Sequence, residues 1–327
     1  MMSVIVAAYN EEKTLGLCLD SLLAQTAPRD SYEIVVADDG STDKTVQVAG
    51  SRGVRVVTQP NRGPSAARNL GAQCARGDIL LFIDADCVPD SRCVEAMAAA
   101  FADPQLAGAS GQKKTRQRNL WARLIQMEYD FKYERLASHP TIDFVDSSTA
   151  GYRREIFISN HGFDTRLKEA EDVELSFRLA ERGYRMVLLP GAITYHTHPE
   201  SLAHYLSRKF QYARGRAIVY ALYPSKAASD RRTPQSQKLQ MILAPTLLVA
   251  VLLAVFWSIL GWVAAALALI FIATTTDLIS YSWKRDKSVA LVVPVTYWLA
   301  AYASGLGAVL GFLQRAINPK LKNPETP

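Results

Sequence analysis

The sequence contains few cysteines, and none of them has the spacing of a metal site or a disulfide framework. The 327 residues include four, at positions 18, 74, 87 and 93, and no two of them form a C-x-x-C pair. We therefore expect reduced structural thiols and no cysteine zinc site. A G-x-G-x-x-G fingerprint is also missing after the first apolar run, which disfavours a dinucleotide-binding domain of the usual kind.

Features of targeting segments and of nucleic-acid-binding proteins are missing as well. The apolar run at residues 4–9 is far shorter than the core of a signal peptide, so we interpret it as a first strand. The net charge is only +6, and basic residues concentrate at residues 208–238. Because no aromatic-rich basic sheet or recognition-helix pattern accompanies this stretch, a membrane surface suits it better than nucleic acid.

The composition changes sharply along the chain. Residues up to about 238 mix polar and apolar types, whereas residues 242–313 are nearly all apolar apart from Lys284-Arg285-Asp286-Lys287. We predict four parts, namely a catalytic domain at 1–200, a basic amphipathic interfacial segment at 201–240, transmembrane helices at 241–314 and a polar tail at 315–327.

The apolar block is long enough for several membrane spans of roughly 20 residues each. We expect three: two within residues 242–281, with a turn near Gly261, and one within residues 289–313. Two spans followed by a re-entrant segment remain the alternative. A third full span would carry Arg315 and the basic tail to the far side, which the positive-inside rule disfavours.

The first 200 residues alternate between apolar runs and helical patterns. Strands are expected at residues 3–9, 32–37, 54–57 and 79–86. Leucines at helical spacing follow the first run, and the basic residues 113–118 are expected to open a later helix. The alternation predicts an α/β fold with a doubly wound, mostly parallel sheet, followed by the C-terminal transmembrane helices.

Asp84 and Asp86 end the apolar run that begins at Ile79. Ligands of open α/β sheets bind at the carboxyl ends of strands, so we expect both acids to face the same opening. Oxygen ligands of this kind suit Mg²⁺ or Mn²⁺ bridging to phosphate oxygens. An isolated Asp-x-Asp is also common in solvated turns. Its position after a buried strand favours a metal site with a nucleotide diphosphate as ligand.

Several short motifs occur in a characteristic order. They are Tyr9-Asn10-Glu11, Asp38-Asp39-Gly40-Ser41, Ala67-Arg68-Asn69, Asp84-Ala85-Asp86 and Glu171-Asp172. Together they resemble the family 2 inverting glycosyltransferases of GT-A fold, including the cellulose-synthase-like and polyprenyl-linked-sugar transferases. Residues 211–215 are similar to the Q-x-x-R-W motif of that family, with Gly215 in place of tryptophan. The likeness extends over residues 3–215.

The resemblance implies a nucleotide-sugar site at the strand ends. Ala7, Tyr9 and Glu11 would border the nucleobase and ribose. Asp39 would recognise the base, Arg68 would steady this pocket, and Asp84 would lie near the ribose. Asp39 fits the N3–H of uracil, and UDP is favoured over GDP, although guanine also offers N–H donors. Residues 38–41 could instead form a plain Asx turn with no binding role.

The resemblance also implies a metal and an acceptor side. Asp86 would bind Mn²⁺ or Mg²⁺, and Asp84 is a further candidate ligand. Independently of the resemblance, His196 ends another expected strand and could reach the metal or the diphosphate, although such a histidine is more often structural. Asp172 would be the general base. Glu171, Gln211 and Arg214 would lie on the acceptor or diphosphate side.

One catalytic carboxylate is enough for this chemistry. Displacement at an anomeric carbon needs a base for the acceptor, and a cation can stabilise the leaving diphosphate. Glycoside hydrolysis would instead need two carboxyl groups flanking the bond. Glu171 and Asp172 would equally suit the start of a helix, where acids are favoured. Gln211 and Arg214 would equally suit a basic helix on lipid.

The leading hypothesis is an inverting, metal-dependent glycosyltransferase that moves a sugar from a nucleotide-diphosphate sugar to a lipid-linked acceptor. It would be a multi-pass protein of the cytoplasmic membrane, with its catalytic domain in the cytoplasm. Gly215 removes the indole on which polymers stack in processive relatives, which favours single additions in glycan or cell-envelope polysaccharide biosynthesis. The alternatives are a polyprenyl-phosphate sugar synthase and a non-catalytic, membrane-anchored nucleotide-sugar-binding subunit.

Overall fold

The computed structural model describes residues 1–230 and 233–321, which form two compact units. The sheet unit comprises residues 1–116 and 133–197. The helical unit comprises residues 117–132 and, among the described residues, 198–321. Arg231, Arg232 and the end of the predicted tail from Lys322 onward lie outside the described residues.

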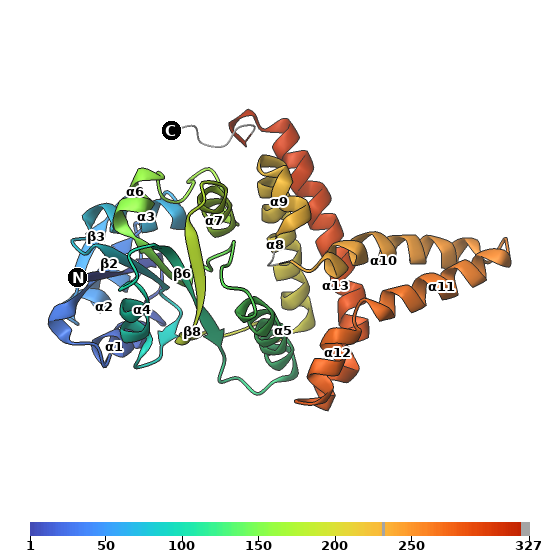
Figure 1. Cartoon of the computed structure of the whole chain (residues 1–327), viewed down its shortest axis with the longest axis horizontal. Coiled ribbons are helices and arrows are strands. Elements are labelled where there is room, and N and C mark those ends of the chain that lie inside the picture. Colours follow the sequence, from blue (N-terminus) through green and yellow to red (C-terminus); the bar gives the residue numbers. More distant parts are fainter. Residues whose placement is uncertain (231–232, 322–327) are drawn as a thin grey trace. The chain divides into compact units, whose positions relative to one another are not determined.

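A single mixed sheet forms the centre of the sheet unit (Figure 1). In the described chain its order is β3-β2-β1-β4-β7-β6-β8-β5. The strands are β1 (Met2–Ala8), β2 (Tyr32–Asp38), β3 (Arg55–Thr58), β4 (Ile79–Asp84), β5 (Val88–Pro89), β6 (Leu106–Lys114), β7 (Thr149–Arg153) and β8 (Arg185–Tyr195). The first four run parallel, β7 is antiparallel to β4 and β6, and β6 is parallel to β8. The predicted α/β sheet is confirmed, with antiparallel pairing in its second half.

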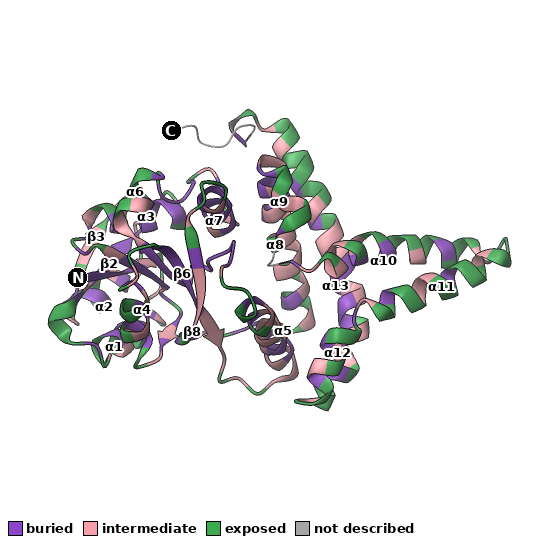
Figure 2. Ribbon diagram, viewed as in Figure 1, coloured by how far each residue is buried: buried purple, intermediate pink, exposed green. Residues whose placement is uncertain are grey.

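Apolar side chains cover both faces of this sheet. Successive residues of a strand point to opposite faces. Val4 and Val6 of β1 pack in one apolar cluster with Leu19, whereas Ile5 packs in a second cluster with Phe82. Figure 2 shows the buried residues gathered along these strands. Burial on both faces is the reason why the strands are continuous apolar runs in the sequence.

Helices connect and cover the strands. Those of the sheet unit are α1 (Leu15–Leu23), α2 (Thr45–Gly50), α3 (Pro64–Cys74), α4 (Cys93–Ala100), α6 (Arg154–Ser159) and α7 (Glu171–Glu181), with a 3-10 turn at Arg29–Ser31. Helix α5 (Leu120–Ala137) contributes residues to both units. The expectation that residues 113–118 open this helix is wrong, because Lys113 belongs to β6 and the helix begins only at Leu120.

The helical unit is built from long apolar helices. They are α8 (Leu202–Leu222), α9 (Pro224–Ser229), α10 (Gln235–Leu253), α11 (Ile259–Ala273), α12 (Thr276–Trp283) and α13 (Lys287–Ile317), with a 3-10 turn at Pro319–Leu321. By length and composition, α10 and α13 could each cross a membrane, and α11 with α12, bent by 49°, could form a third span. The expected turn near Gly261 is wrong, because Gly261 lies inside α11 and the chain turns between Leu253 and Ile259.

Candidate active site

The carboxyl ends of β1, β2 and β4 meet at one edge of the sheet. In the parallel register, Ala7 of β1 lies beside Asp84 of β4, and Ala8 lies beside Asp38 of β2. Side chains that follow these strands therefore share one edge, as the strand order of an open α/β sheet requires. The predicted residues Ala7, Tyr9, Asp39 and Asp84 are all at this edge.

The loop after β1 is tied to the loop after β2. Asn10 adopts a left-handed conformation with φ of 57°, its amide donates to Ser41 Oγ at 2.9 Å, and its Oδ1 accepts from the Thr42 amide at 2.9 Å. The Glu11 amide donates to Thr45 Oγ1 at 2.7 Å. These bonds leave the Tyr9 side chain exposed at the rim. An exposed aromatic ring on a fixed loop can stack on a nucleobase.

Glu11 lies within the electrostatic reach of the Asp-x-Asp turn. Partial burial raises the pKa of its carboxyl, a hydrogen bond with Thr14 opposes this, and the charges of Asp86, Asp43 and Asp84 raise it further. The carboxylates of Asp43, Asp84 and Asp86 thus act together on Glu11 at the strand ends. Such a concentration of negative charge favours a bound cation.

The carboxylate of Asp39 holds the loop that leads into α3. It is nearly fully buried, and its Oδ1 accepts from Gln59 Nε2 at 2.7 Å and from the Arg62 amide at 3.0 Å. Its Oδ2 accepts from the Gly63 amide at 2.8 Å. Gly63 has a φ of 94°, a positive value that favours glycine at this position of the loop. The structure therefore gives Asp39 an organising role in the loop, and its contact with a nucleobase stays a prediction.

Arg68 joins the end of β4 to the start of α7. Its side chain is buried, and Nη2 lies 2.7 Å from Asp84 Oδ1 while Nη1 lies 2.8 Å from Glu171 Oε1. Burial raises the pKa of Glu171, and the charge of Asp172 adds to this, whereas the Arg68 guanidinium opposes it. The two short ion pairs favour the charged form of Glu171, since a guanidinium placed between two carboxylates compensates both.

Asp172 lies in the first turn of α7. The residue before this helix, Ala170, has a left-handed conformation with φ of 65°, which costs energy for a non-glycine residue and sets the direction of the first turn. Asp172 Oδ1 accepts from the Val173 amide at 2.8 Å, and Oδ2 accepts from the Ser147 amide at 3.4 Å. The carboxylate is half-buried and held by backbone amides. These two hydrogen bonds fix the position of both carboxylate oxygens.

Asp86 is surrounded by different partners from those of Asp84. Its Oδ2 lies 3.2 Å from His196 Nε2, and the Cys87 Sγ lies 3.7 Å from its Oδ1. Burial acts to raise the pKa of Asp86, but the hydrogen bond and charge of His196, the Lys113 ammonium and the Cys87 thiol bring it down to about 2. Asp86 is therefore a carboxylate at neutral pH, as a metal ligand must be.

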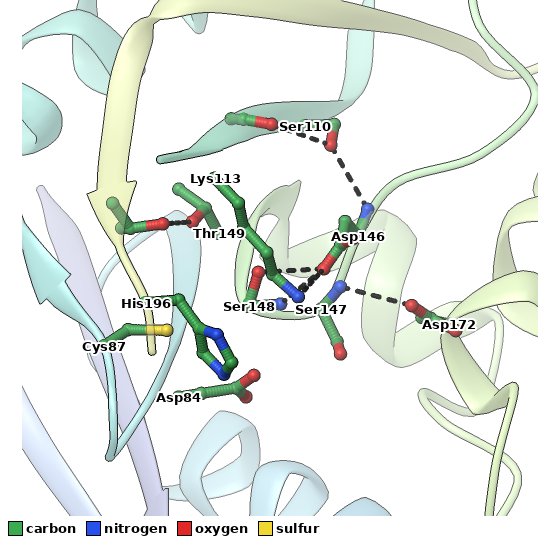
Figure 3. Close-up of polar contacts among 12 residues, drawn as sticks. Asp84, Cys87, Ser110, Lys113, Asp146, Ser147, Ser148, Thr149, Asp172 and His196 are labelled. Carbon is green, nitrogen blue, oxygen red and sulfur yellow. Dashed lines mark hydrogen bonds and ion pairs between the residues drawn. The ribbon is translucent and has the colours of Figure 1, made fainter. Parts of the chain in front are cut away.

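A loop between α5 and β7 fills the space beside Asp172. Lys113 Nζ lies 3.1 Å from Asp146 Oδ1, and Ser148 Oγ donates to the same oxygen at 2.8 Å. Figure 3 shows Lys113 pointing toward Asp146 and the backbone amide of Ser147 directed toward Asp172. The ion pair thus fixes the loop whose Ser147 amide holds Asp172.

The predicted residues fall into two groups. Asp84, Arg68, Glu171 and Asp172 form one connected set within the sheet unit, next to Asp86 and His196. Gln211 and Arg214 lie on α8 in the helical unit, and their place on the acceptor or diphosphate side stays a prediction.

The residues that the sequence interpretation missed are Lys113, Asp146 and Cys87. Cys87 directly follows the Asp-x-Asp motif, and this adjacency was the available signal. The pairing of Lys113 with Asp146 joins β6 to a loop far along the chain, so no local pattern indicates it.

Comparison with known proteins identifies close sequence relatives. A family model described as glycosyl transferase family 2 matches residues 3–159. An N-acetylglucosaminyltransferase of Azorhizobium caulinodans is 32% identical over 234 residues, which are 65% of this chain and 59% of that protein. The chain therefore spans about three fifths of the length of this relative.

Two further proteins extend the comparison. A dolichyl N-acetyl-alpha-D-glucosaminyl phosphate 3-beta-D-2,3-diacetamido-2,3-dideoxy-beta-D-glucuronosyltransferase of Methanococcus voltae is 22% identical over 246 residues, 67% of this chain and 73% of that protein. A solved structure of a mannosyltransferase from Pyrobaculum calidifontis, in complex with GDP-Man and Mn²⁺, superposes with a TM-score of 0.59 and 21% sequence identity. The superposition covers 95% of this chain and 86% of the mannosyltransferase chain. The structural likeness identifies the fold as GT-A-like.

Proposed function

Because a family model of glycosyl transferase family 2 matches residues 3–159, we propose that the chain is an inverting transferase that moves a sugar from a nucleotide-diphosphate sugar to a lipid-linked acceptor. The observation that carries the proposal is the buried guanidinium of Arg68. It binds Asp84 at the donor edge and Glu171 beside the proposed base, with both distances below 3 Å. The proposed donor side and the proposed acceptor side would thus be joined by these two ion pairs.

The donor is proposed to lie along the ends of β1, β2 and β4. Ala7, Tyr9 and Glu11 would border the base and ribose, and Asp84 would reach the ribose. Asp39 Oδ2 accepts one amide hydrogen bond, and a carboxylate oxygen has two lone pairs, so it could also accept the N3–H of uracil. We therefore favour UDP over GDP as the nucleotide.

A divalent cation fits the donor set beside Asp86. The carboxylate of Asp86 and the imidazole nitrogen of His196 are both suitable ligands of Mn²⁺ or Mg²⁺, and Asp84 ends β4 two residues before Asp86. When bound, such an ion stabilises the negative charge of the departing diphosphate. Asp86 would hold it, and His196 would orient Asp86 or bind beside it.

Asp172 is proposed to act as the general base. Its carboxylate would take the proton of the acceptor hydroxyl as the acceptor oxygen forms a bond to the anomeric carbon. The bond from that carbon to the diphosphate oxygen breaks in the same step, so the configuration inverts and a nucleoside diphosphate leaves. The backbone amides of Ser147 and Val173 hold the carboxylate in place for this transfer. Glu171 lies beside it and would position the acceptor.

The acceptor is proposed to be attached to lipid at the cytoplasmic face of a membrane. Two helices are long and apolar enough to cross a membrane, and basic residues lie along α8 immediately before them in the sequence. The name of the Methanococcus relative describes a lipid-phosphate-linked acceptor. Gln211 and Arg214 would meet the acceptor or diphosphate, and Gly215 favours single additions. Basic helices of this kind bind lipid phosphates.

Asp172→Asn tests the proposed base. We expect transfer to a hydroxyl acceptor to fall by about 10²- to 10⁴-fold, because the amide cannot take the proton, while UDP binding measured by calorimetry is retained. Glu181→Gln, at the exposed end of the same helix, is the matched control and should keep wild-type transfer.

Near-normal turnover in Asp172→Asn with a hydroxyl acceptor would contradict the assignment. Retention of rate only with a lipid phosphate acceptor would indicate the alternative polyprenyl-phosphate sugar synthase, because a phosphate oxygen needs little help from a base. Tight UDP binding without any release of UDP from a UDP-sugar in the presence of membrane lipids would indicate a non-catalytic subunit.

A further inference from the structure

Three different ligand atoms meet beside the Asp-x-Asp turn. They are an Asp86 carboxylate oxygen, the Cys87 Sγ and a ring nitrogen of His196, and all of them lie within 4.8 Å of one another. The Asp86 oxygens lie 3.2 Å from His196 Nε2 and 3.7 Å from Cys87 Sγ. Ligands of a tetrahedral Zn²⁺ stand about 3.3–3.8 Å apart, given Zn–N of about 2.0 Å and Zn–S of about 2.3 Å. The two distances from Asp86, one from each of its carboxylate oxygens, are therefore close to the ligand–ligand distances of a zinc centre.

The backbone holds these three residues in position. Val88 of β5 pairs with Tyr195 of β8, which places Cys87 and His196 at the same end of this short antiparallel ladder. The Cys87 amide donates to the Asp84 carbonyl at 3.0 Å, and the His196 amide donates to the Lys114 carbonyl at 2.9 Å. Ligands fixed in this way bind a metal with little loss of conformational freedom.

The burial of the three side chains leaves one direction open. Cys87 is fully buried, the His196 side chain is 10% exposed, and the Asp86 side chain is 44% exposed. A cation would therefore enter over Asp86 and keep a fourth position toward solvent. Three protein ligands with one open position are typical of catalytic rather than structural zinc sites.

We propose that Asp86, Cys87 and His196 form a mixed oxygen, sulfur and nitrogen site that binds Zn²⁺ or Co²⁺ much more tightly than Mg²⁺. Thiolate and imidazole ligands favour the later first-row metals, whereas an all-oxygen Asp-x-Asp pair would favour Mg²⁺ or Mn²⁺. The Cys87 S–H bond breaks as the metal–sulfur bond forms, and its proton passes to solvent. This revises the interpretation of Cys87 as a purely structural thiol.

Occupancy by zinc has a consequence that depends on the proposed transferase function. Zn²⁺ would take Asp86 and His196, so the cation that assists departure of the diphosphate could not bind there at the same time. Zinc should then inhibit transfer, and chelation of the zinc should reverse this inhibition. Metal binding itself needs no substrate and can be measured separately.

Cobalt spectroscopy tests the site on the full-length chain in detergent, after removal of bound metals with EDTA. Co²⁺ should produce visible d–d absorption together with a near-ultraviolet thiolate-to-cobalt charge-transfer band. Zn²⁺ should abolish both, and the same concentration of Mg²⁺ should not. In Cys87→Ser the charge-transfer band should be lost, and the Zn²⁺ affinity should fall on the order of 10-fold or more.

Matched cysteine variants exclude other thiols. Cys93→Ser alters a second buried thiol, in α4, and Cys18→Ser alters one that contacts the Asp84 carbonyl; both should keep the band. No band in the wild-type protein, or a band that survives in Cys87→Ser, would overturn the proposal.

If Cys87→Ser does not fold, His196→Gln replaces it. This variant should weaken Co²⁺ binding and change the d–d spectrum with the thiol intact, and an unchanged spectrum would overturn the proposal. A wild-type protein that shows the band but transfers no sugar would refute the proposed function and leave the metal site standing.

Discussion

Arg68 is the residue on which the two halves of the site depend most directly. The sequence placed it with the nucleotide, as the resemblance implies. In the structure its guanidinium also reaches Glu171, 103 residues further along the chain. A buried cation that compensates two carboxylates is costly to remove, because both acids would remain without it in a region of low polarity.

Arg68→Met should therefore destabilise the fold by about 3–5 kcal/mol and lower the melting temperature by about 10 °C. Circular dichroism melting of the protein in detergent would measure this. The double variant with Glu171→Gln should recover part of the loss, because one of the two buried charges is gone. Arg62→Met, whose side chain is exposed, is the control. A melting temperature equal to that of the wild type would show that the bridge contributes nothing.

The pairing of helices α8 and α13 shows how small residues allow close packing within the helical unit. A Cβ at Gly307 would stand 2.3 Å from the Phe210 carbonyl oxygen, and a Cβ at Gly311 would stand 2.3 Å from the Arg214 carbonyl oxygen. The two glycines thus form the surface on which the turn carrying Gln211 and Arg214 rests. Small residues at four-residue spacing allow helices to approach closely in membranes.

Gly311→Ala should push α8 away from α13. We expect a loss of about 1–3 kcal/mol, the usual cost of overpacking, and a fall in transfer because the backbone of Arg214 must move. Gly305→Ala is the matched control on the same helix, since its Cβ would meet nothing closer than 3.6 Å. Melting curves and transfer rates of the two variants should be compared. Equal values for both variants would contradict this account of the packing.

The whole molecule combines a packed sheet unit with helices that expose apolar side chains. Large apolar residues of α10, α11 and α13, among them Leu252, Trp262 and Leu310, are exposed, as Figure 2 shows along α10 and α11. A membrane would cover such surfaces, and the length of α10 and α13 suits a bilayer of roughly 30 Å.

Membrane integration can be measured by extraction. We expect the chain to stay in the membrane pellet in alkaline carbonate and in high salt, and to be released by detergent. A protein held only by the basic residues of α8 would instead leave the membrane in high salt, because surface charges are screened. Release by salt alone would thus contradict spanning helices.

The sequence by itself determined the α/β sheet and the apolar C-terminal block, and it indicated the likeness to family 2 glycosyltransferases, because each depends on local order: strand periodicity, long uncharged runs and short motifs. It also indicated Asp84 and Asp86 from their place after a strand, and Asp172 through the family resemblance. Only the tertiary structure showed that Asp84 and Glu171 share the guanidinium of Arg68. It alone also showed that Cys87 lies close to His196. Those contacts depend on strand register and on loops that join residues up to about a hundred positions apart, and no local pattern encodes the register of distant strands.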